Sequence, residues 1–320
     1  MGPILLIAVA AGAASALLAA GVAAGSLLAV PLFYLAPLPV MIAGIAFAPL
    51  AALLSLVVSG AGLALVFGGP FLLAYLLGLG GPAFGLSYAA MLARPDPAAR
   101  DGLVWFPVGG LVLLGAGFST LAVTVALFSM AGDYDSYHAA IIAAFEALVA
   151  AQGLPDGGPS PGVDPAVFGS LIARILPGMA AVLSLAAQLV CLYLAGRAAL
   201  LSGRLRRPWP HLSALRLPPV TSLALAIAIG LSMAGAMVGL AASAAASTLV
   251  FAYALAGFAV VHAVTFGHGA RFLILGLLWV TTFALGWPVL AMAVLGFVDG
   301  MLDFRARMPA GRGPPAANDR

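Results

Sequence analysis

The sequence predicts an all-α protein, a polytopic transmembrane helical bundle of about 8–10 membrane segments, some of them short or broken. Of its 320 residues, 64% are hydrophobic and 7% are charged, and the mean hydropathy is +1.17. A soluble domain carries about 25% charged residues, so this chain cannot cover its surface with charge in water. The composition excludes a soluble enzyme, a nucleic-acid-binding protein and a disordered chain, and it predicts membrane lipids as partners.

Counts of single residue types narrow the chemistry further. All 13 basic residues are Arg, so the chain has no Walker lysine and cannot hydrolyse ATP. Cys191 is the single cysteine, which excludes an internal disulfide and Cys-ligated zinc or iron–sulfur clusters. The four His residues lack metal-ligand spacing. We therefore expect no metal and no cofactor.

Proline and glycine divide the N-terminal part into segments, because proline removes a backbone donor and blocks helix continuation. No charged side chain precedes Arg94, so the basic region of a secretory signal is missing and the N-terminus is predicted to be a retained membrane helix. The expected elements are spans at 4–29, 49–67, 71–93 and 103–131, a short helix at 39–48, and a polar loop at 94–101.

Residues 132–167 contain five acidic residues and no Arg. Within this segment, 136–152 is predicted to form an amphipathic helix on the membrane surface. Its apolar face would be formed by Ile141, Ile142, Phe145, Leu148 and Val149. A Pro/Gly loop at 153–166 follows, and Asp164–Pro165 is typical of a helix start.

The C-terminal half is predicted to hold spans at 167–196, 218–242 and 245–267, and a loop at 197–217 with five Arg and no acidic residue. Residues 272–303 are too long for one span and contain Gly286-Trp287-Pro288, so we expect a hairpin of two short helices there.

Arg-bearing short loops stay cytoplasmic. The 197–217 loop and a disordered tail at 305–320 are therefore expected inside, and 132–167 outside. The prediction is a single integral membrane domain, 1–304, in the bacterial inner membrane with both termini cytoplasmic.

Residues 39–52, Pro39-Val-Met-Ile-Ala-Gly44-Ile-Ala-Phe-Ala48-Pro49-Leu-Ala-Ala52, resemble the short second helix and the following turn of the S components of energy-coupling-factor vitamin transporters. In that family a Pro opens the short helix, a Gly lies inside it, and a small residue plus Pro turn the chain into the next span. Here Pro39, Gly44 and Pro49 take those positions, with Ala48 before the turn proline.

The C-terminal stretch Leu295-Gly296-Phe-Val-Asp299-Gly300-Met-Leu-Asp303-Phe304-Arg305 resembles the ending of the YybS-like family, bacterial polytopic membrane proteins that are distantly similar to S components. Together the resemblances imply an S-component-like core and small-molecule binding, with no catalytic residues to carry over. S components dock to a membrane partner subunit through small residues of the first span. The corresponding residues here would be Gly12, Ala16, Ala20 and Ala24, although packing within the same chain is the favoured explanation of this stripe.

Asp299 and Asp303 lie four residues apart and would share one helix face. We expect Asp303 to pair with Arg307 at the cytoplasmic boundary. Asp299 lies one turn deeper, and it is expected to face the protein interior and contact another span or the 197–207 region. Its role would be anchoring first, and proton or ligand coupling second.

Two further groups raise the question of catalysis. Ser87 and His262 would suggest a Ser–His pair, but no oxyanion-hole signature accompanies them. His262 is expected either to bond a neighbouring carbonyl or to contact a ligand. Arg174 is expected to reach the outer interface and to pair with an acid of the outer segment, with Glu146 as the named candidate. Because no catalytic signature accompanies these residues, we predict that the protein is not an enzyme.

Two functions remain open. In the first, the chain is a small-molecule-binding or transporter-like subunit whose site lies between spans, open to the outside under 132–167. In the second, it is a non-transporting membrane scaffold of the cell envelope. A partly polar cavity among the first six spans would favour the first. Candidate ligand or coupling residues are Asp299, His262, Tyr34, Trp105 and Phe33. Arg204, Arg206 and Arg207, beside Trp209, fit a contact with anionic lipid.

Overall fold

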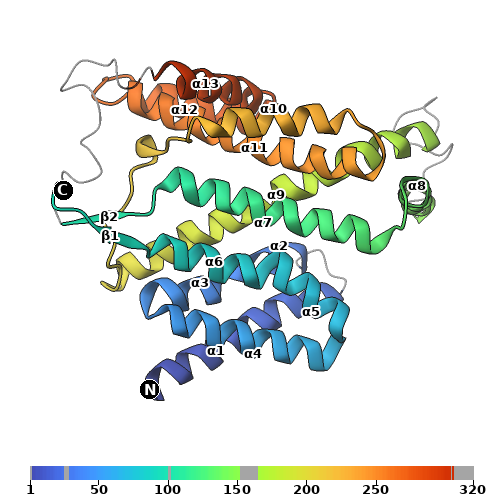
Figure 1. Ribbon diagram of the computed structural model, residues 1–320, viewed down its shortest axis with the longest axis horizontal. Coiled ribbons are helices and arrows are strands. Elements are labelled where there is room, and N and C mark those ends of the chain that lie inside the picture. Colours follow the sequence, from blue (N-terminus) through green and yellow to red (C-terminus); the bar gives the residue numbers. More distant parts are fainter. Residues whose placement is uncertain (1, 25–28, 100–101, 152–164, 304, 306–320) are drawn as a thin grey trace.

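The computed structural model describes residues 2–24, 29–99, 102–151, 165–303 and 305. Within these residues, 7 helices are long and apolar enough to cross a membrane, and three apolar helices are shorter. Figure 1 shows most of these helices running along the long axis of the molecule. The predicted all-α polytopic fold is confirmed.

The first four spans come from six helices and two irregular helical turns. The second span bends at Ala36, and the fourth contains a π-helical turn. The elements are α1 (Gly2–Ala20), η1 (Gly21–Ala24), α2 (Ala29–Leu35), α3 (Pro37–Ala46), α4 (Pro49–Phe67), α5 (Gly69–Tyr75), η2 (Leu76–Gly80) and α6 (Gly81–Ala90).

In residues 29–67, one of the helix breaks expected at prolines is present and another stretch is helical. The break before Pro49 is present, because Ala48 is extended with φ −163° and ψ 154°. Residues 29–35 differ from expectation. They form α2, and Pro31 lies in its first turn, where its missing N–H breaks no hydrogen bond.

A short β-hairpin follows the fourth span. Strands β1 (Ala93–Pro95) and β2 (Leu103–Trp105) are antiparallel, with Arg94 opposite Val104. Residues 103–105 were expected to begin a span, but they form β2 instead. The fifth span therefore begins five residues later, at α7 (Val108–Met130).

Helix α8 (Tyr134–Ala151) lies across the other helices and is seen end-on in Figure 1. Asp133 begins it, because its carboxylate accepts hydrogen bonds from the backbone N–H (2.8 Å) and hydroxyl (3.1 Å) of Ser136. These bonds hold the pKa of the Asp133 carboxyl below its usual value. The predicted apolar face is only partly buried, since Leu148 is 54% exposed. The 153–164 part of the predicted loop lies outside the described residues.

The C-terminal half corrects two expected boundaries. Helix α9 (Pro165–Leu201) continues through Arg197, which was placed in a loop, and it contains Pro177. The next pair of spans divides at 233–235 instead of 243–244, giving α10 (Val220–Ser232) and α11 (Ala236–Val264). Gly235 supplies the positive φ of 71° that ends the turn between them.

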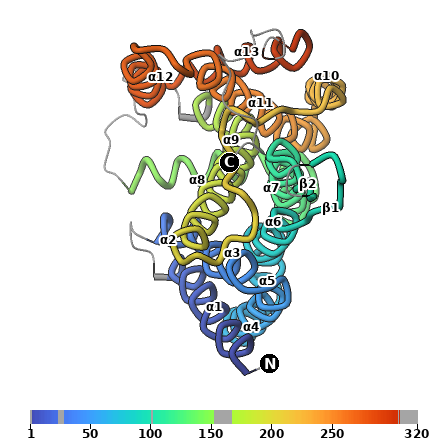
Figure 2. The backbone as a smooth tube through the Cα atoms, turned by 90° about the vertical axis from the view of Figure 1, so that its left-hand side faces the viewer, coloured from blue at the N-terminus to red at the C-terminus, as the bar shows by residue number. Residues whose placement is uncertain are grey.

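The expected hairpin at 272–303 is confirmed as α12 (Arg271–Leu285) and α13 (Pro288–Leu302), joined at Gly286 with φ 72°. A short 3-10 turn, η4 (Leu212–Ala214), lies in the loop before α10. Figures 1 and 2 show α7 and α9 in the middle of the molecule, with α1–α6 on one side and α10–α13 on the other.

The ends of the bundle differ. The start of α1, the β-hairpin, the 202–219 loop and the end of α13 lie at one end, and α8 lies at the other (Figure 1). We call these the Arg-rich end and the α8 end. Residue 2 and residue 305 are therefore both at the Arg-rich end.

Helices α11 and α13 make a very close backbone contact. A Cβ atom added to Gly257 would collide with the carbonyl oxygen of Met292, and one added to Gly296 would collide with that of Tyr253. Small residues that let helix backbones approach are a common way of packing helices in membranes. This contact fixes α13 on the central helix α11.

Hydroxyl groups join the N-terminal helices. The Tyr75 hydroxyl on α5 donates to Ser59 Oγ on α4 (2.7 Å) and lies 2.7 Å from Ser15 Oγ on α1. Ser15 also donates to the carbonyl of Ala36 at the bend of the second span (2.7 Å). Tyr75 is 2% exposed, so this cluster lies inside the bundle and links four helices.

Replacing Gly296 with Ala should destabilise the protein, by about 1–3 kcal/mol for an overpacked core, because the added methyl group meets backbone atoms. The matched control is Gly117→Ala on α7, where an added Cβ meets no atom within 4 Å. Thermal unfolding of the detergent-solubilised variants would measure this. Equal midpoints for the two variants would contradict the close contact.

Candidate functional site

A buried ion pair lies at the Arg-rich end of the bundle. Asp299 on α13 and Arg305 have side chains that are 4% and 5% exposed. Arg305 donates from Nη2 and Nε to Asp299 Oδ2, at 2.8 and 3.0 Å. The acid one turn from the end of α13 is thus neutralised by the arginine that follows the helix.

The same guanidinium also bonds a distant part of the backbone. Its Nη1 donates to the carbonyl oxygens of Ser213 (2.9 Å) and Leu215 (2.8 Å). Leu215 is extended and 2% exposed, so its carbonyl lies inside the protein outside any helix. A buried carbonyl needs a donor, and Arg305 supplies it. The ion pair therefore joins α13 to the segment that precedes α10.

A second ion pair lies closer to solvent. Arg216 Nη1 donates to Asp303 Oδ1 at 2.7 Å, and both side chains are about half exposed (51% and 53%). The expected partner of Asp303 was Arg307, which lies outside the described residues. Asp299 does face the interior, but its partner is Arg305 instead of the 197–207 region.

The other expected ligand residues are not brought together. His262 lies on α11, with Nδ1 2.9 Å from the carbonyl oxygen of Phe258 in its own helix, and its ring meets Trp279 edge-on. Tyr34 lies on α2 beside Phe33, and its carbonyl accepts the thiol of Cys191. Trp105 lies on β2. They occupy three separate elements.

Ser87 lies on α6 and donates to the carbonyl of Phe84 at 3.0 Å. It packs against Gly44 of α3, where an added Cβ would lie 2.7 Å from Ser87 Oγ. Among the described residues nothing joins Ser87 to His262. Gly44 thus serves the packing of the short helix α3 on α6.

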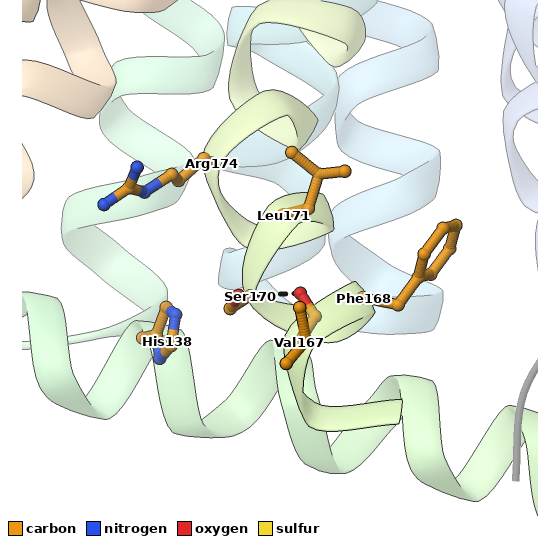
Figure 3. A pocket seen from close by; sticks show the side chains of 6 residues that line it. All are labelled: His138, Val167, Phe168, Ser170, Leu171 and Arg174. Atoms are coloured by element: carbon orange, nitrogen blue, oxygen red, sulfur yellow. Dashed lines mark hydrogen bonds between the residues drawn. The ribbon is translucent and has the colours of Figure 1, made fainter. Parts of the chain in front are cut away.

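A cavity of about 540 Å³ lies at the α8 end, between α8 and the start of α9. We call it the α8–α9 pocket. Figure 3 shows Arg174 and His138 on one side of α9 and Phe168 on the opposite side. The lining residues are His138, Val167, Phe168, Ser170, Leu171 and Arg174.

Three contacts hold α8 against α9 and so shape this pocket. The Tyr137 hydroxyl donates to the carbonyl of Ala173 at 3.0 Å. The rings of Phe145 and Phe168 lie 5.3 Å apart. Gly169 is buried against Ile142, and a Cβ atom added to Gly169 would lie 3.2 Å from the Ile142 side chain.

Arg174 gives the pocket its charge. Glu146, the named candidate for its partner, is not bonded to it: both side chains are exposed, and no hydrogen bond or ion pair holds the Arg174 guanidinium within the described part of the chain. Two other acids of the outer segment, Asp156 and Asp164, lie outside the described residues. His138 stacks on Tyr134, with 5.7 Å between ring centroids, and Ser170 donates to the carbonyl of Val167. The pocket therefore combines one cation and one imidazole with apolar side chains.

A ligand site was expected under 132–167, but neither His138 nor Arg174 was among its expected residues. The expected partly polar cavity among the first six spans is not one of the two cavities described here, which lie at the ends of helices. The sequence feature that could have indicated this pocket was Arg174, a lone charged residue on an apolar helix.

The arrangement of apolar spans around buried hydroxyl, glycine and ion-pair contacts defines a polytopic helical membrane protein. A family model described as "Predicted membrane protein (DUF2232)" matches residues 12–300. The chain belongs to this family. A comparison with curated proteins found no match, and a comparison with solved structures found none either.

Replacing Asp299 with Asn keeps the side-chain shape and leaves Arg305 charged and buried. Removing one partner of a buried ion pair costs about 3–5 kcal/mol, so we expect a large fall in the thermal unfolding midpoint of the detergent-solubilised protein. Asp303→Asn removes a half-exposed charge and should cost about 0–1 kcal/mol. Similar small effects from both changes would show that Asp299 is solvated.

Proposed function

We propose that the chain is a small-molecule-binding membrane protein and that its ligand, an anion with an apolar body, occupies the α8–α9 pocket. The observation that supports this most is the Arg174 guanidinium, which has no partner among the described residues and faces a cavity with apolar walls. Binding, and not catalysis, is the proposed activity.

The position of Arg174 makes an anionic partner favourable. It lies nine residues into α9, about 13 Å along the helix at 1.5 Å per residue. A charged side chain in the hydrocarbon region costs roughly 2.5–3.5 kcal/mol at the helix centre. A carboxylate or phosphate bonded by Arg174 would offset part of this cost.

The rest of the pocket suits an apolar body. Val167, Phe168 and Leu171 line it from α9, and His138 adds a ring nitrogen that can donate or accept a hydrogen bond. Small-molecule sites are typically apolar with a few placed polar groups. The S-component resemblance supports the same class of function, because a short helix with Gly44 inside and a turn at Pro49 is present at α3 and α4.

A non-transporting scaffold of the cell envelope is the second candidate. The observation that favours it is the packing of the N-terminal helices, where the hydroxyl groups of Tyr75, Ser15 and Ser59 bond one another inside the bundle. A scaffold would use the same fold and leave the α8–α9 pocket without a ligand.

Mass spectrometry of molecules that co-purify in mild detergent tests the proposal. An anionic amphiphile should accompany the wild-type protein and fall about tenfold or more in Arg174→Gln, since a hydrogen bond to a charged group contributes about 1.5–3 kcal/mol. Arg94→Gln, on the exposed strand β1, is the matched control. Identical extracts from all three proteins would favour the scaffold.

The proposed location is the bacterial inner membrane, with the Arg-rich end and both termini in the cytoplasm and 132–167 outside. It is supported by five Arg without acid in 197–217 against five acids without Arg in 132–167. In a Cys191→Ser background, a cysteine at position 158 should react with an impermeant maleimide on intact spheroplasts, and one at position 204 should react only after lysis. The reverse pattern would overturn this orientation.

A further inference from the structure

A second cavity, of about 550 Å³, lies at the Arg-rich end of the bundle. Ile4 and Ile7 of α1 form an apolar wall, Phe47 comes from the turn between α3 and α4, and Arg204 and Arg206 come from the loop after α9. We call it the α1–loop cavity. It is separate from the α8–α9 pocket, which lies at the opposite end of the molecule.

Local contacts fix the loop that carries the two arginines. The backbone N–H groups of Arg204 and Leu205 both donate to the carbonyl of Ala199, at 2.9 and 3.1 Å, and close the end of α9. Gly203 supplies the positive φ of 66° that this turn requires. The Arg204 guanidinium lies 4.4 Å from the centroid of the Phe47 ring, a distance at which a cation is attracted to an aromatic face.

The charges in the cavity are uncompensated. Arg204 and Arg206 are exposed, and neither has an ion-pair partner in the ranges that the structure describes. The other two arginines of the 202–219 loop have partners, since Arg207 donates to the carbonyl of Ala90 at 3.1 Å and Arg216 donates to Asp303 at 2.7 Å. Arg204 and Arg206 are therefore the two guanidinium groups of this loop that remain available to an anion.

The wall opposite them belongs to the membrane surface of the protein. Leu5 and Leu6, beside Ile4 on α1, are 55% and 74% exposed and would contact lipid chains. A ligand in this cavity would meet two cations at one end and apolar side chains at the other. That combination matches an anionic phospholipid better than a free anion, which would leave Ile4 and Ile7 without an apolar partner.

We propose that the α1–loop cavity binds one anionic phospholipid of the leaflet at the Arg-rich end. Its phosphate lies against Arg204 and Arg206, and one acyl chain runs along Ile4 and Ile7. Guanidinium groups bind phosphate well because each can donate two parallel hydrogen bonds to the phosphate oxygens. The bound lipid bridges α1, the Phe47 turn and the end of α9, so it stabilises the contact between the N-terminal helix and the middle of the bundle.

Lipid binding to the delipidated full chain in dodecyl maltoside tests this proposal. Native mass spectrometry would count bound lipid, and thermal unfolding would report stabilisation, with phosphatidylglycerol, phosphatidylcholine, glycerol 3-phosphate and inorganic phosphate as probes. We expect phosphatidylglycerol to bind about tenfold or more tightly than phosphatidylcholine and to raise the unfolding midpoint. The two soluble phosphates should do neither at the same concentration.

The variants locate the site. Arg204→Gln and Arg206→Gln should each weaken phosphatidylglycerol binding several-fold, and the double variant should lose the preference over phosphatidylcholine. Arg94→Gln removes one exposed Arg at the same end and should keep it. An unchanged preference in the double variant, or an equal loss in Arg94→Gln, would overturn the proposal. So would inorganic phosphate that binds as tightly as the lipid. If the double variant does not fold, the two single variants make the same comparison.

Discussion

Buried backbone carbonyls outside a helix need hydrogen-bond donors, and the Arg-rich end of this protein depends on how that need is met. The chain between α9 and α10 enters the bundle in an extended conformation, with Leu215 and Leu217 2% and 8% exposed. Arg305 donates to the carbonyls of Ser213 and Leu215. A guanidinium can be placed there only if its charge is neutralised, and Asp299 does so at 2.8 Å.

The need to neutralise Arg305 beside these carbonyls positions much of the C-terminal half. Asp299 must lie beside the extended segment, which fixes the end of α13. Helix α13 in turn lies against α11 through Gly257 and Gly296. On its other side the extended segment touches α7, since a Cβ added to Gly109 would collide with the carbonyl oxygen of Arg216. The ion pair therefore connects α7, α11 and α13 at the same level of the bundle.

The N-terminal half is organised by its helix breaks, and the breaks also produce its surface features. The extended residue Ala48 lets α3 and α4 reverse direction and presents Phe47 at the Arg-rich end. At the α8 end, the transverse helix α8 creates a pocket beside Arg174. In both places irregular geometry at the end of a span brings a cation next to apolar side chains, and these are the two places where we propose that amphiphilic molecules bind.

Composition and proline spacing predicted the fold class, the break before Pro49 and the hairpin around Gly286. They did not predict the strands at 93–95 and 103–105, which are only three residues long, or the division at 233–235, because the Ala- and Ser-rich sequence after it continues as helix without a change in hydropathy. Asp299 could be selected as a buried acid. Its partner could not, because the carbonyls that hold Arg305 in place lie 90 and 92 residues away along the chain.

The other expected ligand residues are not brought together, for a related reason. Tyr34, Trp105 and His262 were selected singly by type and position, and a site depends on which elements the fold brings together. Arg174 carried a real signal, a lone charge on an apolar helix, but its surroundings depend on how α8 crosses α9, and a sequence pattern does not specify that crossing.

A double-mutant cycle between Asp299 and Arg305 measures how strongly the two buried charges depend on each other. Free energies of unfolding would be measured in one detergent for Asp299→Asn, Arg305→Gln and the double variant. If the ion pair holds this end of the bundle together, the two changes are strongly non-additive, with a coupling of about 1–3 kcal/mol. Arg305→Gln should also cost more than Asp299→Asn, because it leaves the Ser213 and Leu215 carbonyls without the guanidinium donor. Additive effects of the two changes would contradict this role of the ion pair.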